Sequence, residues 1–182
     1  MSALCFLCVL LMVGTGGRGV AAIPEKLLAP DAAKYDNFGN FLDLFEDVLV
    51  SSSISDDDVT SNTGSVYTFH LSSDGNDWIF DEKLSLPDPV SYARFGTSIA
   101  LGRGVTGLQQ ITLGVGAGQY HDSGRAYVFA QSSTTRLWSL QANLTSRHES
   151  YLQSFGKSGS MYGDTYVVGS YGDDEGADNS GT

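Results

Sequence analysis

Apolar and polar residues alternate with a period of two in short segments, which glycine-rich and polar turns separate. In Ser65–Leu71, Tyr67 and Phe69 fall on one face of a strand, and Val66 and Thr68 fall on the other. The same alternation returns about sixty residues later, over 125–129. Because both faces of these strands are largely apolar, each sheet that contains them needs cover on both sides. The pattern therefore predicts several small β-sheets packed against one another.

Three segments repeat one order of landmarks, over 25–78, over 82–138 and from 140 onward. Each has a Phe-Gly pair, a strand that ends in small residues, and a polar loop that reaches a glycine. The loops differ in length while the strands keep their order, which is typical of a repeat architecture. The landmarks are Phe38-Gly39, Phe95-Gly96 and Phe155-Gly156, followed by the glycines Gly64, Gly124 and Gly181.

Four short strands in each repeat predict a small antiparallel sheet, and radial packing of such sheets as propeller blades covers both faces. Small residues such as Gly116, Ala117 and Gly169 would let the inner strands crowd toward the axis. The expected fold is therefore all-β, with β-propeller blades of four antiparallel strands. A stacked solenoid of sheets is the alternative. We divide the chain into 1–22, a signal peptide, and the repeats 23–81, 82–139 and 140–182, of which the last is truncated.

A closed ring needs roughly four to eight blades, so about two and a half repeats predict an incomplete ring. The repeat pattern at the end of the chain calls for another strand after Gly181. We therefore expect a fragment, with further propeller repeats beyond the C-terminus.

The order of motifs over 25–182 resembles the FG-GAP repeat: Phe-Gly, a Val-Gly-Ala-like strand, an Asp-rich loop and a Ser-Gly-Ser-Val-Tyr-type strand. This resemblance implies a seven-bladed propeller of extracellular proteins, including integrin α-chains, that serves recognition and scaffolding. It also implies a relation to the propeller beside the catalytic domain of a glycosylphosphatidylinositol-cleaving phospholipase. Two features depart from the family. The proline that gives the FG-GAP motif its last letter is absent near Ser53, Gly118 and Tyr171. The integrin-type calcium loop lacks alternating carboxylates over 43–47, 102–107 and 160–164.

Two acidic triplets stand at matching distances before Gly64 and Gly181, and they are the candidate calcium ligands. Calcium takes six to eight oxygen ligands from a folded-back loop. Consecutive carboxylates on an extended chain point to opposite sides, so a solvated acidic hairpin loop is the alternative. No other cofactor is expected. The triplets are Asp56, Asp57 and Asp58 in the first repeat and Asp173, Asp174 and Glu175 in the third.

Catalysis is not expected, because the histidines His70, His121 and His148 occupy unrelated repeat positions and a G-x-S-x-G elbow is missing. The net charge of -11 argues against nucleic acid as a partner, since its phosphates would be repelled.

An apolar run over 3–13, followed by small residues before Ile23, is typical of a signal peptide and predicts a secreted or cell-surface protein. A buried strand is the alternative for this run. Cleavage after Ala22 would remove Cys5 and Cys8, and with them any disulfide. Asn143 opens the sequence Asn-Leu-Thr, a glycosylation sequon, and it matches Lys83 of the preceding repeat, which predicts that it is exposed.

These patterns together predict a non-catalytic recognition or adhesion module that binds an extracellular protein or glycan through loops at one face. The alternative is an accessory propeller of a secreted, phospholipase-like hydrolase whose catalytic domain is absent from this chain. A purely structural propeller is a third possibility.

Overall fold

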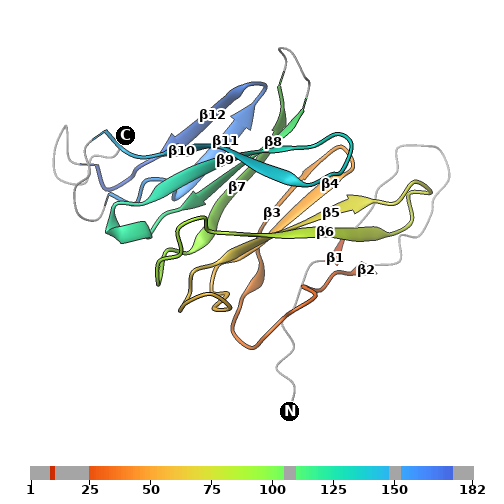
Figure 1. The fold of residues 1–182 in the computed structure, drawn as a ribbon, viewed down its shortest axis with the longest axis horizontal. Coiled ribbons are helices and arrows are strands. Elements are labelled where there is room, and N and C mark those ends of the chain that lie inside the picture. The colour runs from red at the N-terminus through yellow and green to blue at the C-terminus, as the bar shows by residue number, and fades with distance from the viewer. Residues whose placement is uncertain (1–8, 11–24, 105–109, 148–152, 174–182) are drawn as a thin grey trace.

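The computed structural model describes residues 9–10, 25–104, 110–147 and 153–173, so most of the signal peptide predicted over 1–22 lies outside the described residues. The strands form three successive antiparallel sheets (Figure 1), which confirms the all-β prediction. The first sheet contains β3 (Phe38–Phe45), β4 (Val48–Ser53), β5 (Ser65–Leu71) and β6 (Trp78–Ser85). The second contains β7 (Phe95–Arg103), β8 (Ile111–Ala117), β9 (Arg125–Gln131) and β10 (Trp138–Leu144). The third contains β11 (Ser158–Tyr162) and β12 (Thr165–Gly169).

Two short elements complete the described chain. Strand β1 (Val9–Leu10) pairs with β2 (Glu25–Lys26), and a single 3-10 turn covers Tyr120–Asp122. Within the residues described, no helix has the length and apolar character needed to cross a membrane.

Strand β5 is buried on both faces, as its alternation predicts. Val66 lies in the core between the first and second sheets, whereas Tyr67 and Phe69 lie in a second core on the opposite face. Leu27 and Ala29 of the N-terminal segment belong to this second core. The first sheet is thus covered on one side by another sheet and on the other by a single extended segment.

The first and second sheets pack through branched and aromatic side chains. Val48 and Val50 of β4 are fully buried and share one cluster with Phe95, Tyr127 and Phe129 of the second sheet. The ring of Phe95 contacts that of Tyr127 edge-on, with centroids 5.7 Å apart. Burial of side chains of this size contributes about 1.5–3 kcal/mol each, so this core holds the two sheets face to face.

The second and third sheets approach closely where glycines stand on the second sheet. A Cβ atom on Gly116 would lie 1.8 Å from the carbonyl oxygen of Gly156, and one on Gly114 would lie 2.4 Å from the ring of Tyr166. Only a residue without a side chain fits such contacts. Gly116 therefore permits close packing between neighbouring sheets, while its predicted role in crowding toward a propeller axis stays a prediction.

The first strands of the three sheets, β3, β7 and β11, lie next to one another, as the inner strands of propeller blades do. The backbone N–H of Leu101 on β7 donates to Asp43 Oδ2 on β3 at 2.6 Å. Over the described residues the three sheets do not close into a ring (Figure 1).

The sequence repeats and the sheets are offset from each other. The repeat boundary between residues 81 and 82 falls inside β6, and the boundary between 139 and 140 falls inside β10. Trp78 and Trp138 are therefore the first residues of β6 and β10, which are the outermost strands of their sheets. Leu84 also belongs to β6, because β6 pairs with the preceding strand of the same sheet, as β10 does. A sheet runs from one Phe-Gly pair to just before the next.

Candidate functional site

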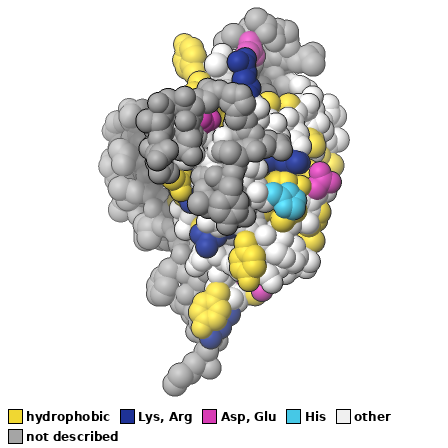
Figure 2. Space-filling model, turned by 90° about the vertical axis from the view of Figure 1, so that its left-hand side faces the viewer, with side chains coloured by type: hydrophobic (Ala, Val, Ile, Leu, Met, Phe, Trp, Pro, Cys, Tyr) yellow, Lys and Arg dark blue, Asp and Glu magenta, His cyan; other side chains and the backbone are white. Residues whose placement is uncertain are grey.

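Three of the connections between strands gather at one end of the sheets, which we call the loop end. They are the β4–β5 connection (54–64), the β6–β7 connection (86–94) and the β8–β9 connection (118–124). The opposite end, which we call the turn end, carries tight turns such as the one between β3 and β4. Figure 2 looks onto the side of the molecule that includes the loop end, where the described residues show intermixed hydrophobic, basic and acidic side chains and a histidine.

The repeat landmarks form a backbone joint between neighbouring sheets at the loop end. The Phe95 N–H donates to the Thr63 carbonyl at 2.7 Å, and a Cβ on Gly64 would lie 2.3 Å from the Phe95 carbonyl oxygen. The next pair of sheets repeats this joint, with the Phe155 N–H 2.9 Å from the Ser123 carbonyl oxygen. Gly64 and Gly124 both have φ +82, and Gly39, Gly96 and Gly156 are also left-handed. Gly181, the third glycine of the series, lies outside the described residues.

A cluster of three carboxylates surrounds Lys83 at the loop end of the first sheet. The Lys83 Nζ lies 2.8 Å from Asp31 Oδ2, 2.8 Å from Asp56 Oδ2 and 2.6 Å from Asp58 Oδ2. Asp56 is buried, whereas Asp57 points into solvent and does not join the cluster. The structure therefore brings together two of the three predicted calcium ligands and adds Asp31, which the sequence pattern did not identify.

Tyr67 completes this cluster from β5. Its hydroxyl lies 2.8 Å from both Asp31 Oδ1 and Asp56 Oδ2, and the Lys83 ammonium lies 5.3 Å from the centroid of its ring. Burial, and then the hydrogen bonds to Asp56 and Asp31, raise the pKa of Tyr67. Burial alone would lower the pKa of Lys83, but its hydrogen bonds to the carboxylates raise it. Both side chains therefore stay protonated at neutral pH.

The geometry of this cluster allows a cation, and the cation it holds is the Lys83 ammonium. The three carboxylates offer oxygens within 4.8 Å of one another, which is a spacing that a metal ion could bridge. Lys83, however, is hydrogen-bonded to all three, so a calcium ion would have to displace a paired ammonium group.

Asp173, the first residue of the second acidic triplet, occupies the corresponding place in the third repeat. Asp173 is buried, and its N–H lies 3.4 Å from the Ser170 carbonyl oxygen, as the Asp56 N–H lies 3.2 Å from that of Ser53. Asp174 and Glu175 lie outside the described residues. In the second repeat Tyr120 takes this position and stacks under the Arg125 guanidinium, 4.2 Å from its ring centroid.

Asn143 of the predicted sequon is exposed on β10. It pairs with Tyr127 in the register in which Lys83 pairs with Tyr67, so the match between Asn143 and Lys83 is confirmed. Glycosylation of Asn143 stays a prediction.

The loop end also contains a cavity of about 520 Å³ between the second and third sheets. Its lining is polar, with two tyrosines at the rim and His121 on the β8–β9 connection. Of the other histidines, His70 bonds Asp81 at 2.6 Å elsewhere, and His148 lies outside the described residues. The eight lining residues are Val90, Ser91, Tyr92, Gly118, Gln119, His121, Ser154 and Tyr171.

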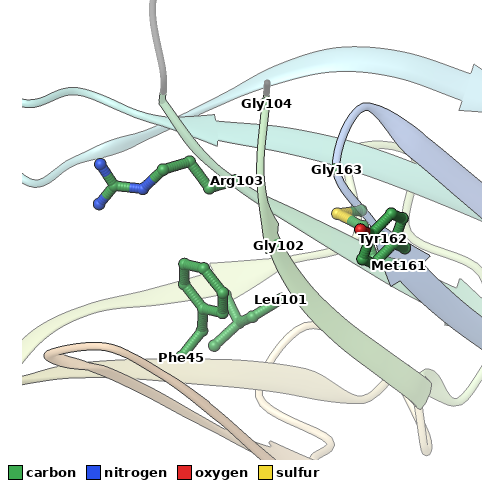
Figure 3. A pocket seen from close by; sticks show the side chains of 8 residues that line it. All are labelled: Phe45, Leu101, Gly102, Arg103, Gly104, Met161, Tyr162 and Gly163. Atoms are coloured by element: carbon green, nitrogen blue, oxygen red, sulfur yellow. The ribbon is translucent and has the colours of Figure 1, made fainter. Parts of the chain in front are cut away.

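A second cavity, of about 450 Å³, opens at the turn end where the inner strands of all three sheets terminate. Figure 3 shows that Phe45 and Leu101 line one side, and that Met161 and Tyr162 line another beside Gly163. Arg103 also borders the cavity, but its guanidinium is paired with Glu46. This cavity is therefore mainly apolar, in contrast to the one at the loop end.

Comparison with known proteins agrees with this architecture. The family model of the FG-GAP repeat matches residues 24–69 and 138–182, which together are half of the chain. The first segment contains Phe38-Gly39 and the second contains Phe155-Gly156, while the unmatched middle repeat forms the same four-stranded sheet and the same glycine joints. A search of curated proteins gives no match. The chain belongs to the FG-GAP repeat family, and its sheets form a β-propeller-like module.

Proposed function

We propose that this chain is a secreted or cell-surface recognition module that binds an extracellular protein or glycan through its loop end and does not catalyse a reaction. The observation that carries the proposal is the way in which the loop-end connections are fixed to one another. Tyr92 N–H donates to the Ser61 carbonyl at 2.7 Å, and the hydroxyls of Thr60 and Ser91 lie 2.7 Å apart. Loops held in this way lose little conformational entropy on binding, which favours recognition.

The side chains at this end also suit binding. Tyr92 and Tyr171 are both largely exposed. Tyrosine offers a large, stiff and amphipathic contact surface at a small entropic cost, which explains its enrichment in binding sites. Exposed tyrosines on fixed loops therefore support a ligand-binding role.

The most strongly perturbed titratable groups do not support catalysis. Burial and the hydrogen bonds to Asp56 and Asp31 raise the pKa of Tyr67, and the hydrogen bonds to the carboxylates raise the pKa of Lys83. A protonated lysine or tyrosine is neither a base nor a nucleophile at neutral pH, and a raised pKa also makes it a poor proton donor. The cluster therefore supports a structural role for these residues.

The test is expression of the full chain in a secreting eukaryotic cell line, followed by binding of the purified protein to cell surfaces and extracellular-matrix proteins. We expect protein in the medium or on the cell surface. We also expect binding that falls about tenfold when Tyr92 and Tyr171 are both changed to Ala. Tyr162→Ala at the turn end is the matched control and should bind like the wild type. Retention in the cytosol, or equal loss in the turn-end variant, would contradict the proposal.

A further inference from the structure

We propose that the loop-end cavity between the second and third sheets binds an uncharged sugar residue, with Tyr92 and Tyr171 as its walls. This inference rests on the proposed function and specifies the class of ligand. The cavity lies where the β6–β7 connection, the β8–β9 connection and the segment after β12 meet. Its volume of about 520 Å³ is within the range of small-ligand sites.

The two tyrosines leave aromatic surface in water. Tyr92 is 58% exposed and Tyr171 is 62% exposed, although both line the cavity. A pyranose ring has apolar C–H groups on its faces and hydroxyls around its edge. An exposed phenol ring can cover such a face while its own hydroxyl forms a hydrogen bond. Tyr92 and Tyr171 therefore match the two kinds of surface that a sugar presents.

The remaining polar side chains of the cavity are neutral hydrogen-bonding groups. Gln119 offers an amide with donors and an acceptor, and Ser91 and Ser154 offer hydroxyls. His121 offers two ring nitrogens. None of the described residues that line this cavity is Asp, Glu, Lys or Arg. A charged ligand would be desolvated here without a partner, so the cavity favours a neutral one.

The backbone fixes these side chains in advance. Tyr92, His121 and Ser154 have φ values of 65°, 45° and 54°, in the left-handed region that non-glycine residues adopt at a cost of about 1 kcal/mol each. The same conformation recurs directly before the other Phe-Gly pairs, at Asn37 with φ 59° and Arg94 with φ 54°, so the repeat fold enforces it. The loops thus present their polar groups in positions that need not be ordered when a sugar binds.

The first repeat supplies a natural control for Tyr92. Tyr35 stands three residues before Phe38, as Tyr92 stands three residues before Phe95. Tyr35 is also left-handed, with φ 79°, and it is 73% exposed, but it does not line this cavity. Replacement of Tyr35 therefore reproduces the backbone and exposure effects of replacing Tyr92 without touching the proposed site.

The experiment uses the secreted full chain on an array of neutral oligosaccharides ending in mannose, galactose or N-acetylglucosamine, beside sialylated and sulfated ones. The best neutral oligosaccharide is then titrated by calorimetry. We expect Tyr92→Ala and Tyr171→Ala each to weaken binding at least about tenfold, and Tyr35→Ala to bind like the wild type. Thermal unfolding of each variant shows that it is folded, and Gln119→Ala provides a second site variant that leaves the strained positions unchanged.

Three results would overturn the inference: no binding of neutral sugars at millimolar concentration, binding of acidic sugars alone, or equal loss in Tyr35→Ala. Cell binding before and after enzymatic removal of surface glycans separates this inference from the proposed function. Loop-end binding that survives removal of the glycans would identify a protein ligand, so the proposed function would stand and the sugar site would fall. Absence of any loop-end binding would overturn both.

Discussion

Gly64 meets Phe95 so closely that a methyl group on Gly64 would lie 2.3 Å from the Phe95 carbonyl oxygen. The two residues belong to neighbouring sheets and are joined through the hydrogen bond between Phe95 N–H and the Thr63 carbonyl. Gly124 and Phe155 repeat the arrangement, with the corresponding separation at 2.1 Å. The recurring glycine and the recurring phenylalanine are thus two halves of one contact between sheets.

Replacement of Gly64 by Ala should destabilise the protein more than a left-handed backbone alone explains. Gly75→Ala is the control, because Gly75 has a similar φ of +74° and nothing within 4 Å of its added Cβ. We expect a loss of about 1 kcal/mol in the free energy of unfolding for Gly75→Ala and about 3 kcal/mol for Gly64→Ala. Urea denaturation followed by circular dichroism measures both. Equal losses would show that the contact with Phe95 contributes nothing.

Removal of Lys83 should convert the carboxylate cluster into a calcium site. Lys83→Met leaves Asp31, Asp56 and Asp58 close together without a cation, so the variant should melt below the wild type in EDTA. Millimolar calcium should then raise its melting temperature, since a ligand that binds only the folded state stabilises it.

Lys34→Met is the control for this experiment, because Lys34 lies over the Tyr35 ring rather than in the cluster. Its melting temperature should respond to calcium like that of the wild type. A Lys83→Met protein that is folded but indifferent to calcium would show that the carboxylates cannot converge on a metal ion.

Alkaline pH should weaken the fold through the same cluster. The folded-state pKa values of Lys83 and Tyr67 are both raised. Their stabilising contribution is therefore fully present below their unfolded pKa values of about 10, and it is lost as the pH rises above them. The free energy of unfolding should fall between about pH 10 and 12, and less steeply in a Lys83→Met, Tyr67→Phe double variant. Parallel curves for the two proteins would contradict this assignment.

Tyr127 provides a spectroscopic marker for the second sheet. Burial raises its pKa to about 12. Titration of tyrosine absorbance should show one late-ionising tyrosine fewer in Tyr127→Phe than in the wild type, because Tyr67, whose pKa is also raised, remains. An unchanged amount of late-ionising tyrosine in Tyr127→Phe would assign this transition to another tyrosine.

Glycosylation of Asn143 is expected when the chain passes through a eukaryotic secretory pathway. The side chain is exposed on the outermost strand of the second sheet, so a glycan would meet no packed neighbour. Mass spectrometry of the secreted protein should show a mass increase that Asn143→Gln and Thr145→Ala both abolish. An unmodified secreted protein would show that the sequon is not used.

The repeat pattern predicted the elements of the fold because each sheet is built from neighbours in sequence. The alternation around Tyr67, the close approach at Gly116 and the match between Asn143 and Lys83 all follow from local period and spacing. The ammonium at the centre of the carboxylates could not be predicted in this way. Asp31 reaches Lys83 across 52 positions, because the N-terminal segment crosses the aromatic face of the first sheet.

The boundaries of the sheets and the loop-end cavity also escaped prediction. The sequence pattern places Trp78 at the end of the first repeat, whereas strand pairing makes it the first residue of β6. The cavity depends on Tyr92, His121 and Tyr171, which come from three connections whose relative placement is set by packing between sheets. Sequence periodicity carries information along a strand and little about how loops from different sheets converge.

The glycine joint has a practical meaning for protein engineering. It is made from main-chain atoms, so it does not constrain the side chain at the adjacent loop position, which is Asp56, Tyr120 or Asp173 in successive repeats. Asp56 belongs to the carboxylate cluster around Lys83, and Tyr120 stacks with Arg125, although the same glycine joint follows each of them. The chain is in effect a modular connector system, in which the display position of one unit can be rewritten without redesigning its attachment to the next.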